Sequence, residues 1–149
     1  MGNWAGHWHG FGPWTGSRSE FAKEGPRRPG ADSGDAETQA FLANTMTPVE
    51  TGHWLLRRSQ AAAERTWTDV AGAAAWMSRV RAANPADQSG GTLLTVDELI
   101  DRKSASLTLG SDVAWGYYTP AFGYVSFAVV CCPSRSLPDI PCPSPPDTR

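Results

Sequence analysis

The amino-acid sequence predicts an α+β fold, with a small antiparallel sheet of two hairpins and two to three helices packed on one face. Residues 113–119 and 124–131 are two runs rich in β-branched and aromatic residues, and the turn-forming sequence Pro-Ala-Phe-Gly separates them. Residues 69–83 and 96–107 carry apolar side chains at helical spacing. Strands and helices that do not alternate singly are typical of an antiparallel sheet with segregated helices.

The second of these runs predicts the central strand of the sheet. Val125, Phe127 and Val129 share one face, and the opposite face is also apolar at the end of the run. A two-stranded hairpin alone is marginally stable in water, so other elements must cover it. We therefore expect the segment YVSFAVV to lie in the middle of the sheet, under two amphipathic helices.

Composition predicts one domain between two loosely structured ends. The chain has 149 residues with 15 glycines and 12 prolines, and only 40% of its residues are hydrophobic. We divide it into a Gly/Trp-rich irregular arm (residues 1–35), a single α+β domain (36–132) and a Pro-rich tail (133–149). The tail holds six prolines, so we expect it to be extended and mobile.

Capping residues define the helices of the domain. Asp35 can begin a helix over residues 36–47, and residues 68–69 can begin the helix over 69–83. Thr95 and Glu98 form a capping-box pattern ahead of the helix over 96–107. Residues 53–59 and 64–68 predict the other hairpin, joined by residues 60–63, although one long helix is an alternative for this region. The expected core residues are Trp54, Leu56, Trp67, Met77, Val80, Leu99, Ile100, Trp115, Val125, Phe127 and Val129.

The glycine-rich arm carries aromatic residues every three or four positions, namely Trp4, Trp8, Phe11 and Trp14. They can pin the arm across the surface of the domain, which is the interpretation we favour, or they can form a segment that becomes ordered on a partner. Exposed aromatic residues and polyproline are common in partner-binding segments. The leading hypothesis is therefore a small non-enzymatic binding protein that acts through a protein partner or as a homo-oligomer.

An alternative hypothesis is a nucleic-acid-binding accessory protein. Five arginines lie within 25 residues and are interleaved with two tryptophans; they are Arg57, Arg58, Arg65, Arg79 and Arg81. A basic hairpin and helix can contact phosphates. The chain has no recognised DNA-binding motif, and its net charge of −2 provides no general attraction to nucleic acid.

A lesser alternative is a zinc protein that uses His7, His9, Cys131 and Cys132. Such a His2Cys2 site would require the arm to fold onto the end of the hairpin. Zinc ligand pairs usually have spacings such as C-x2-C or H-x3-H, which neither the His-x-His pair nor the adjacent cysteines match. The simpler interpretation is that both histidines are solvated and that Cys131 is a small core residue.

Catalysis has little support in the sequence. A Cys–His pair of Cys132 with His53 or His9 would need close contact and a third orienting group. The sequence contains no nucleophile elbow, P-loop or dinucleotide-binding motif. We therefore expect a non-enzymatic protein without a cofactor.

The chain has no run of about 18 apolar residues and no apolar leader near its start. These features predict no membrane partner and a cytoplasmic location. The three cysteines, Cys131, Cys132 and Cys142, are then expected to be reduced.

Overall fold

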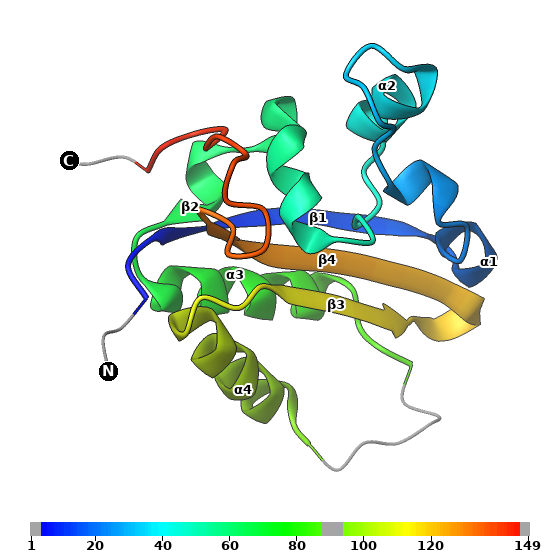
Figure 1. The fold of residues 1–149 in the computed structure, drawn as a ribbon. Coiled ribbons are helices and arrows are strands. Elements are labelled where there is room, and N and C mark those ends of the chain that lie inside the picture. Colours follow the sequence, from blue (N-terminus) through cyan, green and yellow to red (C-terminus); the bar gives the residue numbers. More distant parts are fainter. Residues whose placement is uncertain (1–3, 88–93, 147–149) are drawn as a thin grey trace.

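A computed structural model describes residues 4–87 and 94–146, apart from the side chain of residue 121, and shows a four-stranded antiparallel sheet with a layer on each face (Figure 1). The strands are β1 (His7–Ser17), β2 (Thr66–Trp67), β3 (Val113–Tyr118) and β4 (Gly123–Cys132). The α-helices are α1 (Arg18–Phe21), α2 (Ala36–Ala43), α3 (Val70–Ala83) and α4 (Val96–Thr108). The 3₁₀ helices are η1 (Gly25–Arg27), η2 (Thr51–Leu56), η3 (Arg58–Gln60), η4 (Ala63–Arg65) and η5 (Pro120–Phe122). The predicted α+β class is confirmed.

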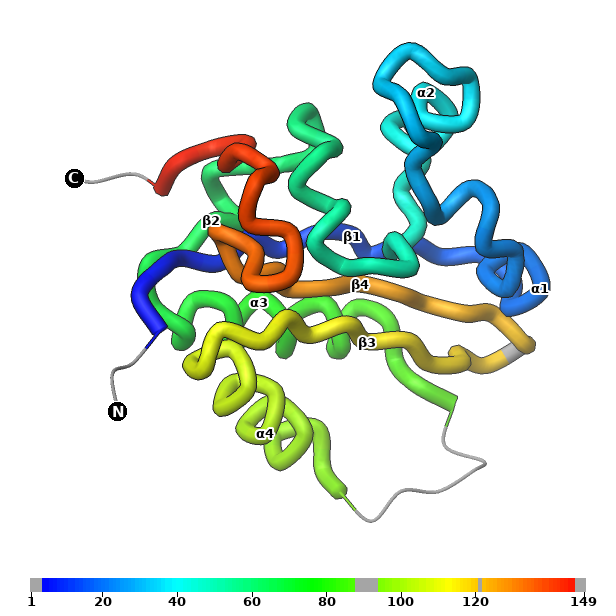
Figure 2. The backbone as a smooth tube through the Cα atoms, viewed as in Figure 1, coloured from blue at the N-terminus to red at the C-terminus, as the bar shows by residue number. Residues whose placement is uncertain are grey.

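Strand β4 is the centre of the sheet, whose order is β2-β1-β4-β3 (Figure 2). It pairs with β3 on one side, where Trp115 lies opposite Phe127, and with β1 on the other. Eight consecutive residues of β4, from Val125 to Cys132, are buried. The predicted central position of this segment is therefore confirmed.

Helices α3 and α4 cover one face of the sheet and form the larger core with it (Figure 1). Phe127 is fully buried there, and its ring centroid lies 5.6 Å from that of Trp76 and 5.4 Å from that of Trp115. The side chain of Asp69 accepts from Gly72 N at the start of α3, and a capping box begins α4. Both helices thus begin where the sequence predicts.

The arm is not irregular throughout, because residues 7–17 form β1. This strand pairs with β4 from His7 opposite Cys132 to Ser17 opposite Gly123. The register shifts between Phe11 and Trp14, where Gly12 has a φ of 94°. The irregularity accommodates Gly12 and Pro13 within the strand, and β4 supplies the hydrogen-bonding partner. The prediction of an irregular arm is therefore wrong for this segment.

The hairpin predicted over residues 53–68 is also wrong. Residues 51–65 form the 3₁₀ helices η2, η3 and η4, and only β2 pairs with β1. The 3₁₀ conformation turns the neighbouring residues Trp54 and Leu55 inward together, which an alternating strand cannot do. Leu55 therefore takes the core position expected of Leu56. The helix predicted over residues 36–47 is also shorter in the structure, where α2 ends at Ala43.

The second face of the sheet carries the 3₁₀ segments, α2 and the returning tail (Figure 1). A second core cluster lies here, formed by Phe11, Trp54, Leu55, Ala128, Val130 and Cys132. Ile140 and Cys142 of the tail pack against it after a turn in which Ile140 N–H donates to Leu137 O (3.2 Å). The tail thereby reaches the end of β4. The division of the chain into an arm, a domain over residues 36–132 and a tail stays a prediction.

Over the described ranges, no helix combines the length and the apolar character that a membrane crossing requires.

Candidate metal centre

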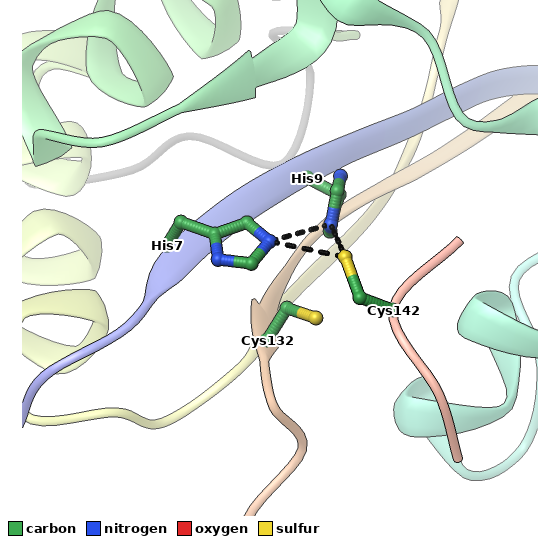
Figure 3. A group of neighbouring side chains, drawn as sticks. All are labelled: His7, His9, Cys132 and Cys142. Carbon is green, nitrogen blue, oxygen red and sulfur yellow. Dashed lines mark hydrogen bonds between the residues drawn. The ribbon is translucent and has the colours of Figure 1, made fainter. Parts of the chain in front are cut away.

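Four side chains that can bind a metal meet at one end of the sheet: His7 and His9 of β1, Cys132 of β4 and Cys142 of the tail (Figure 3). One ligand atom from each lies within 4.8 Å of all the others. The Nε2 atoms of the two histidines are 3.1 Å apart. The Sγ atom of Cys142 is 3.4 Å from Nε2 of His7 and 3.6 Å from Nε2 of His9.

The strand geometry explains why these residues come together. Side chains at positions i and i+2 of a strand point to the same face, so the His-x-His spacing gives two neighbouring imidazoles on β1. His7 lies directly opposite Cys132 in the antiparallel pair, which puts the Cys132 thiol on the same face. Cys142 completes the group because the tail folds back across this face.

The three distances among His7, His9 and Cys142 match the edges of a tetrahedral site. Zinc binds imidazole nitrogen at about 2.0–2.1 Å and thiolate sulfur at about 2.3 Å, which gives tetrahedral edges of about 3.3 Å between nitrogens and about 3.6 Å between nitrogen and sulfur. The measured 3.1, 3.4 and 3.6 Å differ from these by a few tenths of an ångström. These three residues could therefore hold one ion with only small side-chain shifts, and Sγ of Cys132 lies within 4.8 Å of each of their ligand atoms.

Both histidines have lowered pKa values, which favour the neutral imidazole that binds a metal ion. Burial lowers the pKa of His9 to about 4, with a further contribution from His7, and burial also lowers the pKa of His7. The Thr66 hydroxyl donates its one proton to Ala62 O (2.8 Å), so it can only accept from Nδ1 of His9 (3.0 Å). The proton on Nδ1 leaves the lone pair of His9 Nε2 directed into the cluster.

The thiol of Cys132 is protonated unless a cation replaces its proton. Burial raises the pKa of Cys132 to about 12, together with a hydrogen bond to Cys142 and charge repulsion from it. A thiol becomes a thiolate when it coordinates a metal ion, which supplies the positive charge that this environment lacks. Within the part of the chain that the structure describes, the group contains no carboxylate.

The structure brings together three of the four predicted metal ligands and replaces the fourth. Cys131 points to the opposite face, where it is fully buried in the core beneath α3 and α4. Its backbone N–H donates to Oδ1 of Asp112 (2.7 Å), and burial raises the pKa of its thiol to about 12. Cys131 is therefore a core residue, and Cys142 takes its place in the cluster. Sequence reasoning passed over Cys142 because nothing local indicates that the tail returns.

Of the two predicted Cys–His pairs, the structure brings together Cys132 and His9 but not Cys132 and His53. Cys132 and His9 both belong to the cluster. His53 lies elsewhere, with its Nε2 3.6 Å from Oε2 of Glu50 and its ring packed edge-on against the Phe41 ring. The raised pKa of Cys132 disfavours the thiolate that a nucleophile needs at neutral pH. The cluster is thus better suited to metal binding than to nucleophilic catalysis.

Arg57, from the predicted basic surface, is part of the interior. It is 1% exposed, and its guanidinium lies 4.1 Å from the Phe41 ring centroid and 4.6 Å from that of Trp54. It donates to Phe41 O (2.8 Å) and to Met46 O (2.6 Å). In this position it holds α2 to the 3₁₀ segment and cannot contact a phosphate.

The other four arginines do not form one surface. Arg58 donates to the tail on one side of the sheet, whereas Arg79 is exposed on α3 on the other side. Arg65 donates to backbone carbonyls, and Arg81 lies over the Trp115 ring at 4.7 Å. Nucleic-acid binding stays a prediction, and these positions provide no shared basic face for it.

The aromatic residues of the arm contact the rest of the protein. Trp8 and Phe11 are buried on opposite faces of the sheet. Trp4 and Trp14 are half-buried, with ring centroids 5.4 Å from Trp8 and 5.7 Å from Phe21, respectively. The exposed aromatic surface therefore lies outside the arm. Among the described residues, the most exposed large apolar side chain is Phe122, at 93%.

No protein-family model, curated protein or solved structure matches the chain. A functional proposal must therefore come from the chemistry of the side chains that the fold brings together.

Proposed function

We propose that the protein binds one Zn²⁺ ion through His7, His9, Cys132 and Cys142, and that the ion has a structural role. The observation that carries the proposal is the convergence of four ligand atoms within 4.8 Å of one another. These atoms come from both ends of the sequence, at residues 7 and 9 and at residues 132 and 142.

The donor set favours zinc over other common ions. Calcium and magnesium prefer oxygen ligands, and the cluster offers only nitrogen and sulfur. Two thiolates and two imidazoles at the corners of a tetrahedron are a usual coordination of Zn²⁺. A histidine that binds zinc commonly donates from its other ring nitrogen to a neighbouring acceptor, which orients the ring, and Nδ1 of His9 makes such a hydrogen bond to Thr66.

A structural role follows from the number of ligands. Catalytic zinc sites usually keep one position open for water or substrate, whereas four protein ligands close the coordination sphere. The ion would fasten the tail and β1 to the end of β4, in the way that a cross-link joins distant parts of a chain. It would also cover the edge of the second core cluster around Cys132.

Elemental analysis of the purified protein tests this proposal. We expect about one zinc per chain, removable by a strong chelator and restored by added Zn²⁺. Cys142→Ala should abolish stoichiometric zinc, while the matched variant Cys131→Ala should retain it. Wild-type protein that takes up no zinc, or equal loss in both variants, would contradict the proposal.

We also propose a binding role for the protein, through a protein partner or through self-association in the cytoplasm. Support comes from the turn between β3 and β4, where Phe122 is 93% exposed at a φ of 66° and Tyr118 is 52% exposed. Phe122 therefore has little contact with the rest of the protein, at a backbone conformation that residues other than glycine rarely adopt, and its ring is available to a partner.

Sedimentation equilibrium over a range of concentrations tests self-association. Phe122→Ser should weaken any association without lowering stability, since the side chain has little packing to lose. A wild-type protein that is monomeric at every concentration would exclude a homo-oligomer and leave only a different protein as the partner.

A further inference from the structure

The two thiols of the cluster are also placed to react with each other. We propose that Cys132 and Cys142 form a reversible disulfide when a peroxide oxidises them, and that this disulfide and the zinc ion exclude one another. The first half of the proposal depends only on the two sulfurs. The second half rests on the proposed zinc site.

The structure supports the pairing through both position and chain connectivity. The two Sγ atoms belong to one group within 4.8 Å, and they face the same space (Figure 3). A disulfide requires the sulfurs to approach to about 2.0 Å. Cys132 is held in β4, but Cys142 lies in a segment outside any helix or strand, so the approach needs movement of the tail alone.

Exposure sets the order of the two steps. Cys142 is partly exposed, whereas Cys132 is only 2% exposed, so a peroxide reaches Cys142 first. The sulfur of Cys142 attacks one oxygen of the peroxide and gives up its thiol proton. The O–O bond breaks, the sulfur becomes a sulfenic acid, and the departing hydroxide takes up that proton as water. The sulfur of Cys132 then attacks this sulfur and gives up its thiol proton. The S–S bond forms, the S–O bond breaks, and the departing hydroxide takes up that proton as a second water. Two thiols and one hydrogen peroxide thus give one disulfide and two waters.

Disulfide formation removes half of the zinc ligands. A disulfide sulfur carries no negative charge and binds zinc poorly, because the thiolate is the form that coordinates metals. His7 and His9 alone leave the ion with two protein ligands. Oxidation should therefore release zinc, while the new covalent bond keeps the tail attached to β4. The fold is preserved in the zinc-bound form and in the disulfide form, and the disulfide takes the place of the zinc ion as the link between the tail and β4.

Cys131 provides an internal control for this chemistry. It neighbours Cys132 in sequence, but it points into the opposite core and is fully buried there. A thiol on that face cannot reach Cys142 without disrupting the sheet. The reaction should therefore be selective for one of two adjacent cysteines.

The test treats zinc-loaded protein with hydrogen peroxide and follows two signals together: zinc release with a chromogenic chelator, and disulfide formation by peptide mapping without reduction. Trypsin cleaves after Lys103 and Arg135, so a Cys132–Cys142 disulfide links peptide 104–135 to peptide 136–149. We expect one zinc released for each linked pair of peptides, and reversal of both signals by a dithiol reductant plus Zn²⁺. Both signals come from wild-type protein, so the test does not depend on a variant that folds poorly.

The variants identify the cysteine that reacts. The link should persist in Cys131→Ala and disappear in Cys132→Ala. A link that persists in Cys132→Ala, or a link that forms while zinc stays bound, would overturn the proposal.

The two proposals fail in different ways. Zinc-loaded protein that forms no link under peroxide would overturn the disulfide and leave the zinc site standing. Wild-type protein that takes up no zinc but forms the link would overturn the zinc site and its exclusion by the disulfide, while the pairing of the two thiols would be supported.

Discussion

Truncation of Phe127 to alanine should destabilise the protein strongly, because this ring is at the centre of the main core. The side chain is fully buried, with Trp76, Trp115 and Tyr117 at centroid distances of 5.6, 5.4 and 6.5 Å. Phe→Ala substitutions in cores cost about 3–5 kcal/mol, through lost transfer free energy and the cavity that remains. The aromatic pairs add to this loss, so we expect about 4 kcal/mol for Phe127→Ala.

Urea unfolding followed by tryptophan fluorescence measures this loss. With a denaturant slope of about 2 kcal/mol per molar urea, the midpoint should fall by about 2 M. Phe122→Ala is the matched control, since it makes the same chemical change at a side chain that is 93% exposed, and it should change stability by less than about 0.5 kcal/mol. A Phe127→Ala loss below about 1 kcal/mol, or equal losses in the two variants, would refute the central position of β4.

Three further predictions concern the site and the strand that carries it. Thr66→Val should weaken zinc affinity by about 10–100-fold in a chelator competition, because Nδ1 of His9 loses its acceptor, whereas Thr66→Ser should bind normally. Zinc affinity should rise with pH, because burial keeps Cys132 protonated (pKa about 12) and coordination must displace that proton. A zinc affinity that does not change between pH 6 and pH 8 would contradict this prediction. Gly12→Ala should cost about 1–2 kcal/mol at a φ of 94°, whereas Gly25→Ala, where nothing lies within 4 Å of the new Cβ, should be nearly neutral in the same urea assay.

Elements with strong local signals could be predicted from the sequence. The capping residues Asp69 and Thr95 mark the starts of α3 and α4. The run over residues 124–131, which is apolar on both faces at its end, marks a strand buried on both faces. Each of these signals lies within a few residues of the structure that it specifies. The class of the fold follows from them, since such helices and strands have few ways to bury their apolar faces.

Strand β1 and the segment before β2 lacked such signals. The glycines and the Gly-Pro step of the arm oppose regular structure locally, and pairing with β4 overrides them. A Cβ at Gly10 would lie 2.8 Å from the Trp67 ring, so the glycine serves a contact with a residue far along the chain. The inward turn of Trp54 and Leu55 likewise depends on the second face of the sheet, which exists only after β1 and β4 have paired.

The candidate metal centre also combines features that the sequence determines with features that depend on tertiary contacts. The sequence by itself determined the two helices, the central strand and the presence of imidazoles and thiols near the two ends of the chain. Only the tertiary structure decided which cysteines meet the histidines: the register puts Cys132 opposite His7, and the returning tail brings Cys142 to them. The physical reason is that helix caps and strand alternation act between near neighbours, whereas a metal site formed by residues 7 and 142 depends on contacts that exist only once the chain has folded.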